Sequence, residues 1–101
     1  MEYTEKETAQ EGIDKVCNSM ARLLTEKNKR YGNSALEPMR VFSRADPAEG
    51  ILVRLDDKLS RIKYASNEGN LLRKNDIADM MGYLVLYCVK QGWTSFDDLI
   101  D

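Results

Sequence analysis

One stretch of sequence decides the fold: residues 75–86 read NDIADMMGYLVL and are apolar on nearly every side of a helix. A single polar stripe interrupts them, because Asp76, Asp79 and Tyr83 follow one another at three- and four-residue spacing. A carboxylate is rarely buried without a partner, since desolvating it is costly. The stripe therefore predicts a cation opposite it, from a neighbouring helix or from a metal ion.

The composition predicts a single all-helical domain spanning residues 1–101. A hydrophobic content of 43% with 32% charged residues suits a globular chain that has one core. The net charge of −2 gives no general reason to expect binding to nucleic acid or to acidic membranes. No apolar run is long enough to cross a bilayer, and the amino terminus does not resemble a signal peptide. We therefore expect a cytoplasmic protein with no membrane partner.

The chain contains no histidine, which excludes a histidine-based nucleophilic site and a histidine-ligated zinc. Cys17 and Cys88 each lie in an apolar helical pattern without CxxC spacing, so both are expected to be reduced thiols. If the protein is an enzyme, carboxylates with a hard divalent cation are the chemistry that remains.

The periodicity predicts an all-α fold, an antiparallel three-helix bundle with a short helical turn at the carboxyl end. The first helix runs from about Thr4 to Tyr31, where Gly32 stops it. The segment from Ala35 to Ala45 has no clean period and is expected to be a loop or a short turn.

The second helix is expected to start at Asp46, with Pro47 in its first turn and Glu49 completing a capping box. It continues to about Ala65, and its expected apolar face is Leu52, Leu55, Leu59 and Ile62. The third helix runs from Leu71 or Leu72 to Lys90 or Gln91 and ends at Gly92. A short turn follows at 96–100, which Thr94 or Ser95 caps and Trp93 and Phe96 hold to the body.

The third helix is apolar around so much of its circumference that two neighbouring helices cannot cover it. We therefore expect a homo-oligomer, most simply a dimer. The residues that would continue into another subunit are Met80, Met81, Leu84, Val85 and Tyr87.

The second helix offers the cations that the aspartates require. Arg54, Lys58 and Arg61 form one basic stripe, with Lys58 bordering the apolar face and Arg61 pointing further outward. Antiparallel packing would bring Lys58 and Arg61 close to Asp76 and Asp79. One interpretation is an ion-pair network that sets the register of the two helices. The other is a site for a phosphorylated ligand, and spacing alone favours the first.

A third segment, residues 26–34, is rich in hydrogen-bond donors and supports the second interpretation. It contains Lys27 and ends in Tyr31 and Gly32, where the aromatic ring could stack on a base and the glycine would allow close approach of the backbone. A polar helix end with a glycine cap explains the same residues without a ligand.

Together these segments resemble a group of small all-helical bacteriophage proteins. The shared order is Lys27-x-x-x-Tyr31-Gly32, then Asp57-Lys58-x-x-Arg61, then Asp76-x-x-Asp79-x-x-Gly82-Tyr83. One branch of that group is the nucleotide modification associated domain 1 family, which is distantly similar to the MazG-like all-α nucleoside triphosphate pyrophosphohydrolases. The resemblance covers about Leu23 to Gly92.

The resemblance implies a nucleotide ligand and Mg²⁺. Asp76 and Asp79 match one of the two acidic pairs of MazG-like enzymes in spacing, so they would be the catalytic carboxylates and metal ligands. Asp57 would be a further metal ligand. The other acidic pair has no clean match, since Leu59 and Ser60 stand three residues after Asp56 and Asp57. Lys27, Tyr31, Lys58, Arg61 and Tyr83 would contact the ligand.

Three functions therefore remain open. The first is a magnesium-dependent nucleotide pyrophosphohydrolase. The second is a noncatalytic protein that sequesters or senses a nucleotide. The third is a helical interaction protein, such as an inhibitor of a host enzyme, in which the polar network is structural.

Overall fold

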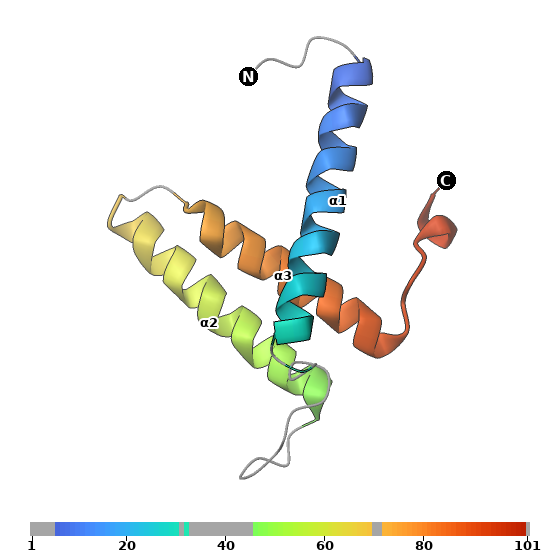
Figure 1. Ribbon diagram of the computed structural model, residues 1–101. Coiled ribbons are helices and arrows are strands. Elements are labelled where there is room, and N and C mark those ends of the chain that lie inside the picture. Colours follow the sequence, from blue (N-terminus) through green and yellow to red (C-terminus); the bar gives the residue numbers. More distant parts are fainter. Residues whose placement is uncertain (1–5, 31, 33–45, 70–71, 101) are drawn as a thin grey trace. The chain divides into compact units, whose positions relative to one another are not determined.

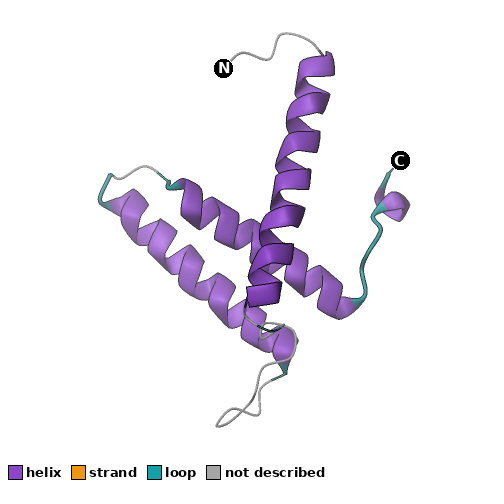
Figure 2. Ribbon diagram, viewed as in Figure 1, coloured by secondary structure: helices purple, strands orange, loops and turns teal. Residues whose placement is uncertain are grey.

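The computed structural model describes residues 6–30, 32, 46–69 and 72–100 of the chain. Within these ranges the fold is all-α, as predicted, and Figure 2 shows helices joined by loops without a strand. The chain divides into two compact units, Met1–Gly32 and Asn33–Asp101. The predicted segment 35–45, with Thr4, Tyr31 and Leu71, lies outside the described residues.

The first unit contains one helix, α1, which spans Lys6–Arg30. Its length agrees with the prediction to within the residues that are described. Gly32 has a φ of +59°, the left-handed conformation that favours glycine after a helix, so the expected stop is confirmed.

The second unit contains α2, Pro47–Asn67, α3, Lys74–Gln91, and a short 3₁₀ turn, η1, Asp97–Leu99. Figure 1 shows α2 and α3 running side by side in opposite directions, and the two helices pack against each other. This pair is the antiparallel arrangement that the short break between them predicts.

Two helix starts differ from the prediction. Asp46 does precede α2 and Pro47 does occupy its first turn, but the Asp46 side chain caps no backbone N–H, so the capping box does not form. Its main-chain carbonyl accepts instead from the Gly50 N–H at 3.0 Å. Helix α3 begins at Lys74, because Arg73 is extended and its carbonyl accepts the N–H groups of Asp76 and Ile77.

The carboxyl end of α3 is as predicted. Gly92 has a φ of +79°, and the Trp93 N–H donates to the Cys88 carbonyl at 2.9 Å. The short turn that follows is stabilised by Ser95, whose hydroxyl accepts from the Asp97 N–H at 3.3 Å. The Trp93 ring meets the Tyr87 ring edge-on with 6.0 Å between the ring centroids, and the side chains of Trp93 and Phe96 are both exposed.

The core between α2 and α3 includes only part of the apolar face predicted for α2, since Leu55 is buried and Ile62 is half-buried. Ile51 is 2% exposed, and Ala48 and Leu55 are also buried, while Leu52 and Leu59 are exposed. The apolar surface of α2 is wider than α3 can cover, so one side of it is buried against α3 and the other side stays exposed. Lys58 shares that buried side, because it follows Leu55 by three residues and precedes Ile62 by four.

Candidate functional site

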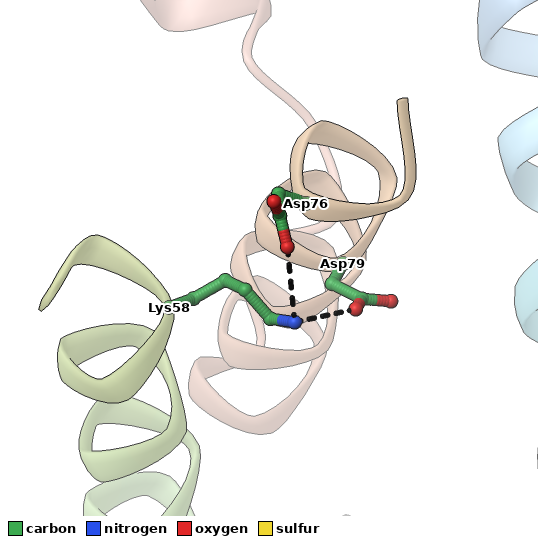
Figure 3. Close-up of polar contacts among 3 residues, drawn as sticks. All are labelled: Lys58, Asp76 and Asp79. Atoms are coloured by element: carbon green, nitrogen blue, oxygen red, sulfur yellow. Dashed lines mark hydrogen bonds and ion pairs between the residues drawn. The ribbon is translucent and has the colours of Figure 1, made fainter. Parts of the chain in front are cut away.

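Lys58 crosses the interface between α2 and α3. Its side chain is 13% exposed, because it emerges from α2 on the same face as Ile51 and Leu55. The aliphatic stem can remain against apolar neighbours while the ammonium reaches a polar partner. Figure 3 shows that this ammonium extends to two carboxylates on the first turns of α3.

Both predicted aspartates bind that ammonium. Lys58 Nζ lies 2.9 Å from Asp79 Oδ2 and 3.4 Å from Asp76 Oδ1 (Figure 3). The side chains of Asp76 and Asp79 are 20% and 31% exposed, so Asp79 forms the shorter contact although it is the less buried of the two.

The electrostatics of the cluster favour a charged lysine. The hydrogen bond to Asp79 raises the pKa of Lys58, desolvation of the ammonium lowers this pKa, and the charges of Asp79 and Asp76 raise it again. The outcome is a Lys58 pKa above its ordinary value. Two carboxylates and one ammonium give these three side chains a formal net charge of −1.

Two other predicted ligand residues lie on the same helices. Tyr83 is half-buried on α3, one turn beyond Asp79 and on the same face. Arg61 is exposed on α2, one turn beyond Lys58, and it forms no hydrogen bond or ion pair with the part of the chain that the structure describes. Its guanidinium is therefore accessible to solvent beside the cluster.

Of the remaining predicted residues, only Asp57 can be compared with this cluster, because it lies on a described helix of the same unit. Asp57 is exposed on α2, and the structure does not group it with Asp76 and Asp79. Lys27 is exposed on α1, in the other unit, and Tyr31 lies outside the described residues.

Asp76 and Asp79 are also the residues for which the sequence predicts a metal ion. Across residues 6–30, 32, 46–69 and 72–100, no three His, Cys, Asp or Glu side chains are grouped to hold a metal ion. Mg²⁺ commonly uses only one or two carboxylates and completes its shell with water and substrate phosphates. Asp76 and Asp79 have the donor atoms for that arrangement, but the Lys58 ammonium already provides the cation between them.

The sequence placed Lys58 at the border of the apolar face of α2, and its inward position was missed. The available signal was the spacing of Ala48, Ile51, Leu55, Lys58 and Ile62, which alternates three and four residues. A lysine at one of these positions, opposite two aspartates on the next helix, marks the ion pair.

Comparison with known proteins adds no family to these observations. No family model matches the chain, and no curated protein or solved structure matches it at a significant level. No helix in the described part of the chain has both the length and the apolar character needed to cross a bilayer.

Proposed function

We propose that this chain is a phage-type cytoplasmic protein that binds a nucleotide, or a small molecule derived from one, beside the contact between α2 and α3. The observation that carries the proposal is the pairing of Lys58 with both Asp76 and Asp79. These residues belong to two separate segments of the resemblance to small phage proteins, and the fold joins the segments at one point. A ligand site at this point would explain why the Lys58 segment and the Asp76–Asp79 segment both belong to the resemblance.

The charge of the cluster indicates how a nucleotide would bind. A net charge of −1 repels phosphate, and Arg61 alone only balances it. A divalent cation between Asp76 and Asp79 would reverse that balance and allow Lys58 and Arg61 to take phosphate oxygens. Nucleotide binding is therefore expected to require Mg²⁺.

The proposal has a catalytic form, a nucleoside triphosphate pyrophosphohydrolase. Bound by Asp76 and Asp79, Mg²⁺ would neutralise phosphate charge and lower the pKa of a bound water molecule. Arg61 would then orient the phosphate through its planar fork, and Lys58 would supply a point charge. Tyr83, with Tyr31 and Lys27, would contact the remainder of the nucleotide, and Asp57 is the further carboxylate that the resemblance offers.

Calorimetric titration with nucleoside triphosphates, with and without Mg²⁺, tests the proposal. Saturable binding that requires Mg²⁺ and is lost in Asp79→Asn is the expected result. Asp98→Asn on the exposed η1 turn is the matched control and should bind as the wild type does. Release of pyrophosphate in the same samples, detected by phosphorus NMR, identifies the catalytic form, and binding without turnover identifies sequestration.

A helical interaction protein is the second candidate, and the exposed apolar side chains of the second unit favour it. Leu84, Val85 and Val89 on α3 and Leu52 and Leu59 on α2 are all exposed. In this alternative the Lys58 cluster only sets helix register, and the apolar surface meets a host protein or further copies of the chain within a helical bundle. A chain that binds no nucleotide in either buffer supports this candidate and contradicts the first.

A further inference from the structure

Helix α1 carries an apolar stripe with the spacing that pairs two helices. The stripe consists of Ala9, Ile13, Val16, Met20 and Leu23, whose spacing alternates four and three residues. This spacing averages 3.5 residues, as in the seam of a coiled coil, and Cys17 and Leu24 extend the apolar face on one side of it. Ile13, Val16 and Leu23 are exposed, and Met20 is half-buried.

A helix with such a stripe needs a partner. Most helices in proteins are stabilised by packing of an apolar face more than by the helix propensity of their residues. The local contacts within α1 are weak, since the Lys29–Glu26 ion pair is exposed and the Gln10–Asp14 hydrogen bond lies at the surface. We propose that α1 pairs in antiparallel orientation with α1 of a second copy of this chain.

The charge distribution along α1 selects the antiparallel orientation. From Ser19 to Arg30 the helix has four basic residues and one acidic residue, a net charge of +3, whereas Thr8 to Asn18 has a net charge of −1. A parallel pair would place the two +3 segments together. An antiparallel pair sets each of them against the −1 segment of the other copy, and it also opposes the two helix dipoles.

The seam also specifies a register. Antiparallel packing that fills the stripe places Ile13 opposite the partner's Leu23 and Val16 opposite the partner's Met20. The two-fold axis then passes near Asn18, the midpoint of both pairs. Cys17, which is exposed and borders the seam, comes to lie beside the partner's Cys17.

This interface differs from the α3 surface that the sequence suggests, and the two can be compared directly. Val16 on α1 is 53% exposed and Leu84 on α3 is 51% exposed, so Val16→Glu and Leu84→Glu are matched changes. Sedimentation equilibrium of the full chain should show a dimer that Val16→Glu weakens by more than about a hundredfold, since two unpaired carboxylates would enter the seam. Leu84→Glu should leave the dimer unchanged. A monomeric wild type, or a dimer weakened by Leu84→Glu and not by Val16→Glu, would overturn the proposal.

Cross-linking tests the register and does not depend on the folding of a charged variant. Full-length Cys88→Ser retains Cys17 as its one thiol, and mild oxidation should convert most of it to a covalent dimer. In the control, Cys17→Ser and Cys88→Ser are combined with Thr25→Cys, so that the one thiol lies on the outer face of α1. The proposed register places the introduced thiols of the two copies roughly 20 Å apart along the helix axis. Rapid formation of the Cys17 dimer with little dimer from the control supports the antiparallel pair, whereas equal yields, or more dimer from the control, contradict it.

Discussion

Lys58 is the residue on which the second unit depends, because it combines an inward position with a charge. It occupies a place on α2 that an apolar residue would normally take, between Leu55 and Ile62, and its ammonium contacts both Asp79 and Asp76. Such a pair limits how far one helix can slide along the other, since a shift of one residue would separate the ammonium from the carboxylates. The same contact places the charges that a nucleotide site would use.

The raised pKa of Lys58 makes one contribution to stability dependent on pH. Because the folded chain holds the proton more tightly than the unfolded chain, the contribution is fully present below the ordinary lysine pKa of about 10.4. It is lost as the pH rises through the raised pKa of the folded state. Urea unfolding of the wild type and of Lys58→Met from pH 8 upward should therefore show a difference in unfolding free energy that shrinks in the alkaline range. Lys63→Met, on the exposed side of α2, is the control, and an equal change in both variants would contradict the assignment.

Substitution of Arg61 can distinguish a nucleotide-binding site from an ion-pair network that is only structural. Its side chain is exposed and bonds to nothing within the described residues, so Arg61→Lys should leave the unfolding free energy almost unchanged. Affinity for a nucleotide should fall, by about 1–3 kcal/mol, because lysine cannot reproduce the planar fork that meets two phosphate oxygens. Arg54→Lys, two turns earlier on α2, should have less effect in the same titration. Equal affinity of Arg61→Lys and the wild type would place the phosphate elsewhere.

Residues at the helix ends determine where α2 begins and where α3 stops. Pro47 at the start of α2 lacks the N–H that would otherwise need a cap, and Gly92 ends α3 in a left-handed conformation. Two glycines of the second unit therefore have opposite roles. Gly92 is required by its backbone, whereas Gly50 lies inside α2 with open space where a Cβ would be placed.

This difference predicts two alanine substitutions of opposite sign. Gly92→Ala should destabilise the chain by about 1 kcal/mol, because a residue with a Cβ resists a φ of +79°. Gly50→Ala should stabilise it by about 0.5–1 kcal/mol, because alanine loses less conformational entropy in a helix. Chemical denaturation of the two variants provides the measurement, and a stabilising effect of Gly92→Ala would show that the helix end adopts another conformation in solution.

For the molecule as a whole, the described residues bury few large apolar side chains. Ile51 and Leu55 are the large members of the α2–α3 core, while exposed apolar residues occur on α1, α2 and α3 and after Gly92. Exposed apolar surface of this extent commonly marks an interaction site. The chain is therefore expected to gain much of its stability from association.

Association predicts that thermal stability depends on concentration. If copies of the chain fold and assemble together, Tm should rise as the protein concentration is raised from low to high micromolar, because mass action favours the assembled state. Differential scanning fluorimetry across that range tests this, and Val16→Glu should flatten the dependence if the α1 pair is responsible. A wild-type Tm that does not change with concentration would show that the isolated chain supplies its own stability.

Much of this architecture could be derived from local patterns. Helix periodicity, Pro47 and the two terminating glycines were sufficient to predict α1, α2, α3 and the turn after Trp93, since each depends on residues close together in sequence. The stripe of Asp76, Asp79 and Tyr83 likewise predicted a cation opposite it, from a neighbouring helix or from a metal ion, and in the structure Lys58 of α2 contacts both aspartates.

Other features depended on which surfaces meet. The apolar arc of α2 includes Leu52 and Leu59 as well as Ile51 and Leu55, and periodicity could not show that α3 covers only the second pair. The same packing places Lys58 inside and leaves Asp57 and Arg61 outside, which separates residues that adjoin one another in sequence. The reason is physical: helical spacing assigns a side chain to a face, whereas burial and ion pairing depend on the partner helix and on the angle at which it packs.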